Sequence, residues 1–319
     1  MKNNHNLLMK MKNLEKFSGA IKRCVAIAMA TMLFATTGFS LDTHPVKAQE
    51  VSSSADKIEI PEISKDAFKK YKKISGIGAN TILGADFTYY QQCLEWGKSY
   101  KNYMSQSVDN IFDYVKSQGI NTISLKVAVN PTGENAYLSL DNAIKTLKAV
   151  KASKANLKTN LVLLYSDEMT YAGENGQKLP ADWEKAEKAE QSVSRVESAK
   201  TYTKEIIAKL KQVNVLPDIV TIGNEVDWNF LGITDGEGWE GWKAMGDISA
   251  LLKKEGVKNA VSIAAPSDAA SVKYIVQKLG YASVDYDYIG VNVYPDNNTN
   301  NYIKSLKKEV ESCASDKQL

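Results

Sequence analysis

Short apolar segments alternate along the chain with longer segments of helical period, from Ile74 onward. The short segments are nearly continuous in apolar residues, which is typical of strands buried on both faces of a sheet. They are Thr81–Phe87, Ile120–Val129, Leu157–Tyr165, Ile219–Asn224, Ala260–Ala264 and Tyr288–Val293. The helical segments are Val108–Gln118, Leu140–Ser153, Val193–Val213, Trp239–Glu255, Ala269–Leu279 and Tyr302–Ser312. Gly119 and Gly256 stand where helices should end, so the pattern predicts six βα units around a parallel sheet.

Two architectures are compatible with this order, an eight-unit β/α barrel and an open, doubly wound sheet. The open sheet would be favoured by a glycine-rich phosphate fingerprint after the first strand, but Gly84-Ala85-Asp86 is not followed by that spacing. Polar and aromatic residues instead follow the strand ends, where barrel enzymes place catalytic groups. These residues are Asp86, Asn130, Tyr165, Asp167, Asn224, Glu225, Asn292 and Tyr294. The sequence therefore predicts a (β/α)8 TIM-barrel fold over residues 74–319, with about six βα units present.

The first 48 residues have the three parts of an export signal. Five basic residues between Lys10 and Arg23 precede the apolar run Cys24–Phe39, and Val46-Lys47-Ala48 follows. We expect a signal peptide over residues 1–48, cleaved after Ala48, and a secreted protein with no stable membrane association. A retained anchor is the alternative, although the apolar run is shorter than the ~20 residues that span a bilayer. Residues 49–73 predict a linker or a poorly ordered arm.

Charge and histidine content exclude several partners. The first 48 residues hold seven of the 40 Lys and Arg but two of the 37 acids, so the remaining chain is close to neutral. It lacks the concentrated basic face that nucleic acid requires. Both histidines, His5 and His44, lie in the leader, and Cys93 and Cys313 beyond it cannot be assigned a bridge from spacing alone. We therefore expect no metal ion, no cofactor and no nucleic-acid partner.

A buried strand that ends in Gly223-Asn224-Glu225 carries the most informative chemistry. A glycosidase needs a carboxylic acid at this edge to protonate the departing sugar oxygen, and an amide can bind a ring hydroxyl. An isolated Asn-Glu pair is otherwise explained as a helix N-cap with an acid in the first turn. Trp228 follows the pair, and its ring can stack on a sugar face. This combination favours a sugar-processing site.

Five segments in order resemble glycoside hydrolase family 53, the arabinogalactan endo-β-1,4-galactanases. They are Gly84-Ala85-Asp86, Val127-Ala128-Val129-Asn130-Pro131, Tyr165-Ser166-Asp167, Pro217–Glu225 and Asp287–Pro295. The resemblance implies a retaining two-carboxylate mechanism on a plant-type polysaccharide, with Glu225 as the general acid–base. The residues expected to contact the polysaccharide are Asp86, Lys126, Asn130, Tyr165, Asp167, Asn224, Trp228 and Tyr294.

The chain also departs from the family's pattern. Lys126 stands where the family has an Arg, Ala128 replaces a Trp, and Leu164 replaces a His. The family's nucleophilic Glu lies on the seventh strand, beyond the helix that follows Tyr294-Pro295. We therefore expect the nucleophile to be absent from these 319 residues, because the last acids belong to a Lys-rich helical segment that is typical of a solvated surface.

Three functions remain to be compared. The first is an exported, endo-acting glycosidase of the galactanase type, or a hydrolase for a different β-glycan. The second is a non-catalytic carbohydrate-binding barrel, which the missing nucleophile would favour. The third, an α/β metabolic enzyme, is disfavoured by the export signal and by the absence of a phosphate-binding loop.

Overall fold

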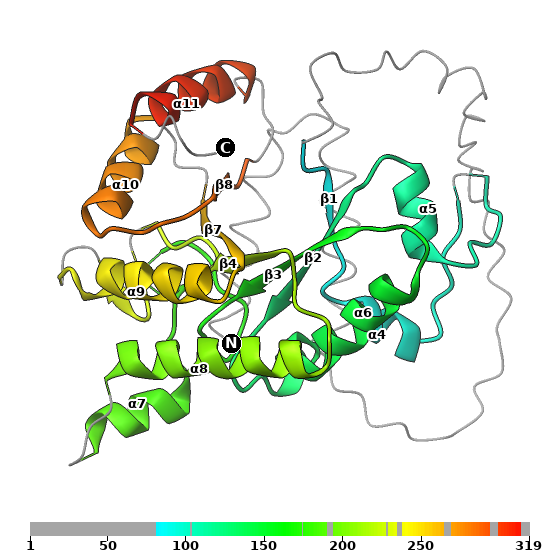
Figure 1. The fold of residues 1–319 in the computed structure, drawn as a ribbon, viewed down its shortest axis with the longest axis horizontal. Coiled ribbons are helices and arrows are strands. Elements are labelled where there is room, and N and C mark those ends of the chain that lie inside the picture. The colour runs from blue at the N-terminus through cyan, green and yellow to red at the C-terminus, as the bar shows by residue number, and fades with distance from the viewer. Residues whose placement is uncertain are drawn as a thin grey trace, which may run out of the picture. The chain divides into compact units, whose positions relative to one another are not determined.

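The computed structural model describes residues 81–102, 104–173, 175–189, 194–227, 229–234, 238–264, 269–293 and 299–313. Its main sheet comprises β1 (Gly84–Asp86), β2 (Thr122–Val127), β3 (Lys158–Leu163), β4 (Ile219–Ile222), β7 (Lys258–Ile263) and β8 (Tyr288–Val291). All neighbouring strands are parallel and follow the chain order β1-β2-β3-β4-β7-β8 (Figure 1). This is the order of consecutive units in a (β/α)8 barrel, and within the described residues the sheet ends at β1 and β8. The six predicted strands and the partial barrel are confirmed.

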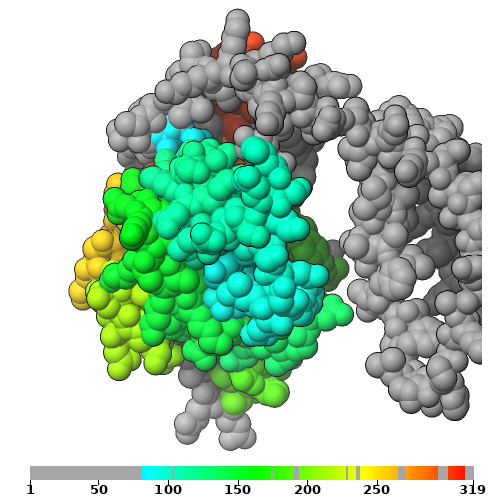
Figure 2. Space-filling view, turned by 90° about the vertical axis from the view of Figure 1, so that its right-hand side faces the viewer, coloured from blue at the N-terminus to red at the C-terminus, as the bar shows by residue number. Residues whose placement is uncertain are grey.

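The six predicted helices are also present, with ends that differ by a few residues. They are α5 (Ile111–Ser117), α6 (Leu140–Ala152), α8 (Arg195–Gln212), α9 (Glu240–Lys254), α10 (Ala269–Tyr281) and α11 (Thr299–Cys313). Figure 1 shows α8 beside α9 and α10 beside α11, in agreement with their contacts. Figure 2 shows the face on which the cyan and green residues of the first βα units gather, with yellow and orange residues at its margin. None of the helices within the described ranges is both long and apolar enough to cross a bilayer.

Four further elements lie in the connections and were not predicted from the sequence. They are α4 (Tyr90–Glu95), the 3-10 helix η2 (Gly133–Leu138), α7 (Ala181–Lys188) and a hairpin of β5 (Asn229–Phe230) with β6 (Ile233–Thr234). All four occur after the carboxyl end of a strand of the main sheet. The expected leader (1–48) and arm (49–73) lie outside the described residues.

Local signals explain where the helices begin and end. The Asn110 side chain accepts a hydrogen bond from the amide of Phe112 at 2.9 Å, and Ser139 and Ser194 cap α6 and α8 in the same manner. Gly119 and Gly256 have φ of +96° and +75° beyond the ends of α5 and α9. The predicted left-handed caps are therefore confirmed.

The two faces of the sheet differ in chemistry. One face carries buried aliphatic side chains of the core, among them Leu125 of β2, Leu161 of β3 and Ile222 of β4. The other face borders a cavity of about 370 Å³ whose walls include Ser124, Lys126, Asn160, Thr221, Asn224, Ser262 and Asn292. Asn160 connects neighbouring strands there, donating to Ser124 Oγ at 3.2 Å and accepting from Thr221 Oγ1 at 2.9 Å. Barrel interiors are commonly packed with bulky branched residues, whereas this inner face combines polar side chains with apolar ones such as Val162 and Ile219.

Candidate active site

The backbone leaves the regular ladder immediately after β4. Gly223 and Glu225 have φ of +70° and +56°, in the left-handed region. The amide of Gly223 still donates to the carbonyl of Leu163 at 2.9 Å, and the amide of Val226 donates to the carbonyl of Ser262 at 3.0 Å. The segment between these two rungs, residues 223–225, therefore forms a bulge that presents Asn224 and Glu225 at the carboxyl edge of the sheet.

Two donors from different parts of the chain hold the carboxylate of Glu225. The amide of Ala172, in the β3–α7 connection, donates to Oε2 at 2.9 Å. Asn292, which follows β8, donates through Nδ2 to Oε1. Glu225 is half-buried. Groups from β3, β4 and β8 thus converge on a single carboxylate.

The β3–α7 connection also fixes the main chain of the bulge. Gln177 is buried, and its Nε2 donates to the carbonyls of Asn224 at 2.8 Å and Glu225 at 3.2 Å. Asn224 Nδ2 donates to the carbonyl of Thr170 at 2.7 Å, and Thr170 Oγ1 donates to the carbonyl of Asn224 at 3.3 Å. The Asn224 amide group is therefore engaged by protein on its donor side, while its residue borders the inner cavity.

A second acid, Asp227, lies two residues beyond Glu225 and is 3% exposed. Its Oδ1 accepts a hydrogen bond from the amide of Ala264 at 2.6 Å. Burial raises the pKa of Asp227 to about 6, and the nearby charge of Glu225 contributes in the same direction against the lowering effect of the Ala264 hydrogen bond. The site therefore contains a buried acid whose protonation changes in the weakly acidic range.

Asp86 and Lys126 form an ion pair at the ends of β1 and β2. Asp86 Oδ1 also accepts from the amide of Thr88 at 2.8 Å. Burial acts to raise the pKa of Asp86, but the hydrogen bonds from Lys126 and Thr88 outweigh it and hold that pKa below its usual value. Asp86 is therefore an ionised, engaged carboxylate.

Three residues that were expected to contact the polysaccharide, Tyr165, Asp167 and Asn130, do not line the inner cavity. The Tyr165 side chain is buried in the core, where its hydroxyl bonds Thr203 Oγ1 of α8 at 2.9 Å and its ring packs against Phe230. This placement corrects the expectation that Tyr165 lines the sugar site. Asp167 accepts from the amides of Asn130 and Ala181, both at 3.0 Å, and thereby joins the β2–α6 connection to α7.

Asn130 is exposed and borders a separate groove of about 680 Å³, together with Asp182, Trp183 and Tyr202. Its Nδ2 lies 3.4 Å from Asp182 Oδ2. Lys126 and Asn224 border the inner cavity. Trp228 and Tyr294 lie outside the described residues.

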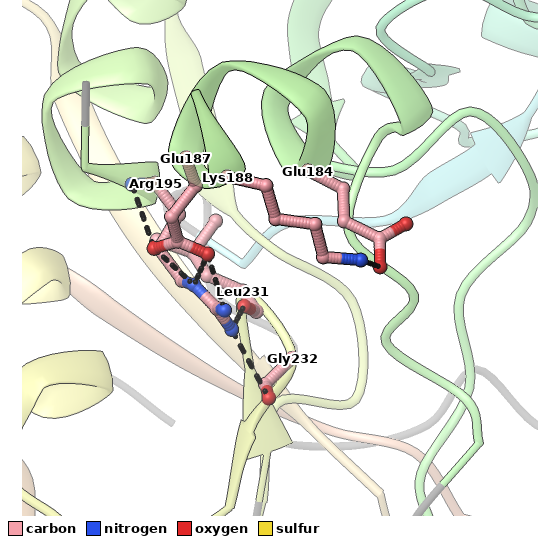
Figure 3. Close-up of polar contacts among 6 residues, drawn as sticks. All are labelled: Glu184, Glu187, Lys188, Arg195, Leu231 and Gly232. Carbon is pink, nitrogen blue, oxygen red and sulfur yellow. Dashed lines mark hydrogen bonds and ion pairs between the residues drawn. The ribbon is translucent and has the colours of Figure 1, made fainter. Parts of the chain in front are cut away.

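The hairpin β5–β6 lies next to the bulge and is held by a charged pair. Glu187 accepts from Arg195 Nε with both oxygens at 2.9 Å, and Arg195 Nη1 donates to the carbonyls of Leu231 at 3.1 Å and Gly232 at 3.4 Å (Figure 3). Phe230, in this hairpin, packs against the Tyr165 ring with centroids 5.3 Å apart. The hairpin, which Arg195 holds through its main-chain carbonyls, therefore packs against the bulge through Phe230.

Four contributing residues were not assigned from the sequence: Ala172, Gln177, Asp227 and Asn292. Asn292 was recognised at a strand end but not as a partner of Glu225, and Asp227 could have been noticed from its spacing to Glu225. Ala172 acts through its amide, which no sequence pattern reveals. Among the described residues, no group of three His, Cys, Asp or Glu side chains is placed to hold a metal ion, and Cys93 forms no disulfide.

A partial β/α barrel with a carboxylate held at the carboxyl edge belongs to the class of barrels that place active sites at that edge. The model described as Glycosyl hydrolase family 53 matches residues 82–317. The chain belongs to this family, and the resemblance seen in its motifs is confirmed.

Curated relatives are similar at moderate identity. The arabinogalactan endo-β-1,4-galactanase of Cellvibrio japonicus is 28% identical over 235 residues, which cover 69% of this chain and 59% of that protein. The probable arabinogalactan endo-β-1,4-galactanase A of Aspergillus terreus is 29% identical over 258 residues, covering 74% and 68%. The endo-β-1,4-galactanase of Bacillus subtilis is 26% identical over 234 residues, covering 70% and 52%. The chain thus spans between half and two thirds of the length of most of these relatives.

Solved structures agree on the fold. The fungal β-1,4-galactanase structure matches with a TM-score of 0.62 at 24% identity, covering 74% of this chain and 70% of that one. The family 53 catalytic domain of Ignisphaera aggregans matches with a TM-score of 0.61 at 22% identity, covering 76% and 66%. At this identity the likeness describes the fold and not the substrate.

Proposed function

We propose that the protein is a glycoside hydrolase that cleaves β-1,4-galactosidic bonds in a plant-type polysaccharide, with Glu225 as its general acid–base. The observation that carries this proposal is the placement of Glu225 on the bulge after β4, next to a cavity lined by Asn224 and Asn292 and between donors from two other connections. The names of the curated relatives support galactan as the substrate. A carboxyl group at this position can protonate the departing glycosidic oxygen.

Retaining hydrolysis needs a second carboxyl group about 5–5.5 Å from the first, on the opposite side of the scissile bond. The other acids described near this edge include Asp86, Asp167, Glu168 and Asp227, and each is engaged; Glu168 pairs with Lys178 at 2.7 Å. Asp86 pairs with Lys126, Asp167 accepts from two main-chain amides, and Asp227 is buried against Ala264. We therefore propose that the nucleophile lies outside the described residues.

A hydrolase for a related β-glycan is the second candidate, and one observation favours it. Ala128 and Leu164, where the family has Trp and His, are buried together with Leu138 and Val162 in a small apolar cluster. Such a cluster offers no hydrogen bond to a sugar hydroxyl, and a missing polar partner can change discrimination strongly. Comparing rates on β-1,4-galactan and on other β-linked glycans distinguishes the two candidates.

Export is also part of the proposal. The basic region, the apolar run and Val46-Lys47-Ala48 support cleavage after Ala48. N-terminal sequencing of protein recovered from the culture medium should begin at Gln49. Recovered material that begins at Met1 would contradict this.

The test of function compares the complete product of the encoding gene with its Glu225→Gln variant on β-1,4-galactan. We expect release of reducing ends by the native protein and a loss of ~10²–10⁴ in rate in the variant, because the amide cannot donate the proton. Release by the native protein from another β-glycan but not from galactan would support the second candidate. No release from any glycan would favour a carbohydrate-binding barrel.

A further inference from the structure

We propose that Asp227 is a positioning residue for Glu225: its carboxylate takes the place of a main-chain carbonyl in the ladder between β4 and β7 and thereby fixes the bulge. The catalytic consequence of this role rests on the proposed function, but the role itself is a property of the fold. Nothing in the motif pattern assigned a role to Asp227.

Hydrogen bonds to β7 lie on both sides of the bulge. Parallel strands exchange evenly spaced amide-to-carbonyl bonds, and β4 pairs regularly with β7 as far as Ile222 opposite Val261. Beyond the bulge, the amide of Val226 donates to the carbonyl of Ser262 at 3.0 Å. The amide of Ala264 donates to Asp227 Oδ1 at 2.6 Å. Beyond the bulge, the Asp227 side-chain oxygen therefore accepts the hydrogen bond from β7 that a main-chain carbonyl of β4 would accept in a regular ladder.

Packing leaves the bulge little freedom around this contact. Val226 and Asp227 are 1% and 3% exposed. A Cβ added to Gly223 would lie 2.2 Å from Val226 Cγ1, so the backbone of Gly223 packs directly against the Val226 side chain. If Asp227 releases Ala264, the chain after the bulge loses one of its two described hydrogen bonds to β7. The Glu225 carboxylate is then held less firmly against Ala172 and Asn292.

The same device occurs at the opposite edge of the sheet, away from Glu225, and provides a matched control. Asp218 precedes β4, and its Oδ2 accepts from the amide of Thr159 on β3 at 2.8 Å. Asp287 precedes β8, and its Oδ2 accepts from the amide of Asn259 on β7 at 2.8 Å. Removing either side chain should loosen a ladder end without displacing Glu225.

Residue-resolved amide hydrogen exchange on the 319-residue chain tests the proposal without any substrate. The amide of Ala264 reports the direct contact, and the amide of Ala172 reports the position of the Glu225 carboxylate that it donates to. In Asp227→Ala we expect both amides to exchange at least about tenfold faster, as the loss of a fixed acceptor implies. In Asp227→Asn both should remain protected, because the amide oxygen still accepts, and in Asp218→Ala the amide of Ala172 should be unchanged.

The proposal is overturned if Ala172 stays protected in Asp227→Ala while Ala264 exchanges, because Asp227 would then be a local ladder end only. If Asp227→Ala does not fold, Asp227→Glu carries the test, since its longer side chain keeps the charge and shifts the acceptor. Faster exchange at Ala172 in Asp227→Glu supports the proposal, and native exchange there contradicts it.

A kinetic arm on the complete gene product separates this proposal from the proposed function. Misplacing a catalytic group by about 1 Å can cost on the order of 10²-fold, so Asp227→Ala should lower kcat by roughly 10- to 100-fold with KM nearly unchanged, and Asp227→Asn should restore kcat. An unchanged kcat in Asp227→Ala would overturn the catalytic consequence. If no glycan is hydrolysed by the native protein, the proposed function fails while the exchange result stands.

Discussion

At the amino edge of the sheet, side chains that precede β2, β4 and β8 accept hydrogen bonds from main-chain amides, whereas at the carboxyl edge β4 ends in a left-handed bulge. Asn121, Asp218 and Asp287 each stand before a strand at the amino edge and accept an amide hydrogen bond from the preceding strand in the sheet. Asp227 does the same at the carboxyl edge, but only after Gly223 and Glu225 have left the ladder. We propose that the same kind of contact stabilises the sheet at the first edge and positions Glu225 at the second.

The acids at the two edges also differ in the direction in which their pKa is shifted. Burial acts to raise the pKa of Asp287, but Lys253 at 2.7 Å and the amide of Asn259 outweigh it and hold that pKa below its usual value. Burial raises the pKa of Asp227 to about 6, against the lowering effect of the hydrogen bond from the amide of Ala264. The amino edge is stabilised by its charges, while the carboxyl edge holds a carboxyl group that is costly to ionise.

The largest stability effect should come from adding a side chain to the bulge. Gly223→Ala requires a non-glycine residue at φ +70° and places Cβ 2.2 Å from Val226 Cγ1. The left-handed conformation costs ~1–2 kcal/mol and overpacking ~1–3 kcal/mol, so urea unfolding should show a loss of about 3 kcal/mol.

Gly119→Ala is the matched control for this substitution at the opposite edge. Gly119 has φ +96°, but nothing lies within 4 Å of its added Cβ. Its cost should therefore be the conformational part alone, ~1–2 kcal/mol. Equal losses in the two variants would show that the bulge is not tightly packed.

The pH dependence of stability should have opposite signs at the two edges. The folded pKa of Asp227 lies at about 6, above its ordinary value of 3.8, so the folded chain binds more protons between these values and loses stability as the pH rises through them. Relative to Asp227→Asn, the native free energy of unfolding should fall by roughly 2 kcal/mol between pH 4 and pH 7.

Asp287 gives the reverse case, because its folded pKa is lowered. Its contribution should be fully present above pH 3.8 and should be lost as the pH falls through the folded pKa. Urea unfolding of Asp287→Asn beside the native protein measures this difference. A native stability that exceeds that of Asp227→Asn by a constant amount at all pH values would contradict the contrast.

The smallest effect concerns Tyr165, which the sequence placed at the sugar site and the structure places in the core. Tyr165→Phe removes the hydroxyl that bonds Thr203, and Thr203 keeps its bond to the carbonyl of Ala199 at 2.8 Å. We expect a loss of about 1 kcal/mol in urea unfolding and an unchanged KM for galactan in the complete gene product. A raised KM would restore Tyr165 to the sugar site.

The regular part of the fold was predictable because its signals are local. Apolar runs such as Leu157–Tyr165 predict strands, and glycine at 119 and 256 predicts helix ends, independently of distant contacts. The connections escaped prediction because α4 and α7 are short and contain no fully buried residue, and because the β5–β6 hairpin depends on Arg195 from another helix. Short elements gain stability mainly from tertiary contacts, which periodicity does not report.

The site was predictable only in part for a related reason. Glu225 could be identified because its strand and its motif are continuous in sequence. Ala172 and Gln177 act on it through contacts that span about 50 residues, and Tyr165 was misplaced because its φ of +53° turns the chain where a regular strand was expected to continue. The place of a side chain that follows a strand is therefore harder to predict from sequence than that of a side chain within the strand.

The central claim, that the carboxyl edge acts on glycans through Glu225, is tested most directly by reducing-end release from β-1,4-galactan. The complete gene product should release reducing ends, and Glu225→Gln should reduce the rate ~10²–10⁴-fold. Asp218→Ala, at the opposite edge, should keep the native rate per folded molecule. A Glu225→Gln variant with the native rate would contradict the account.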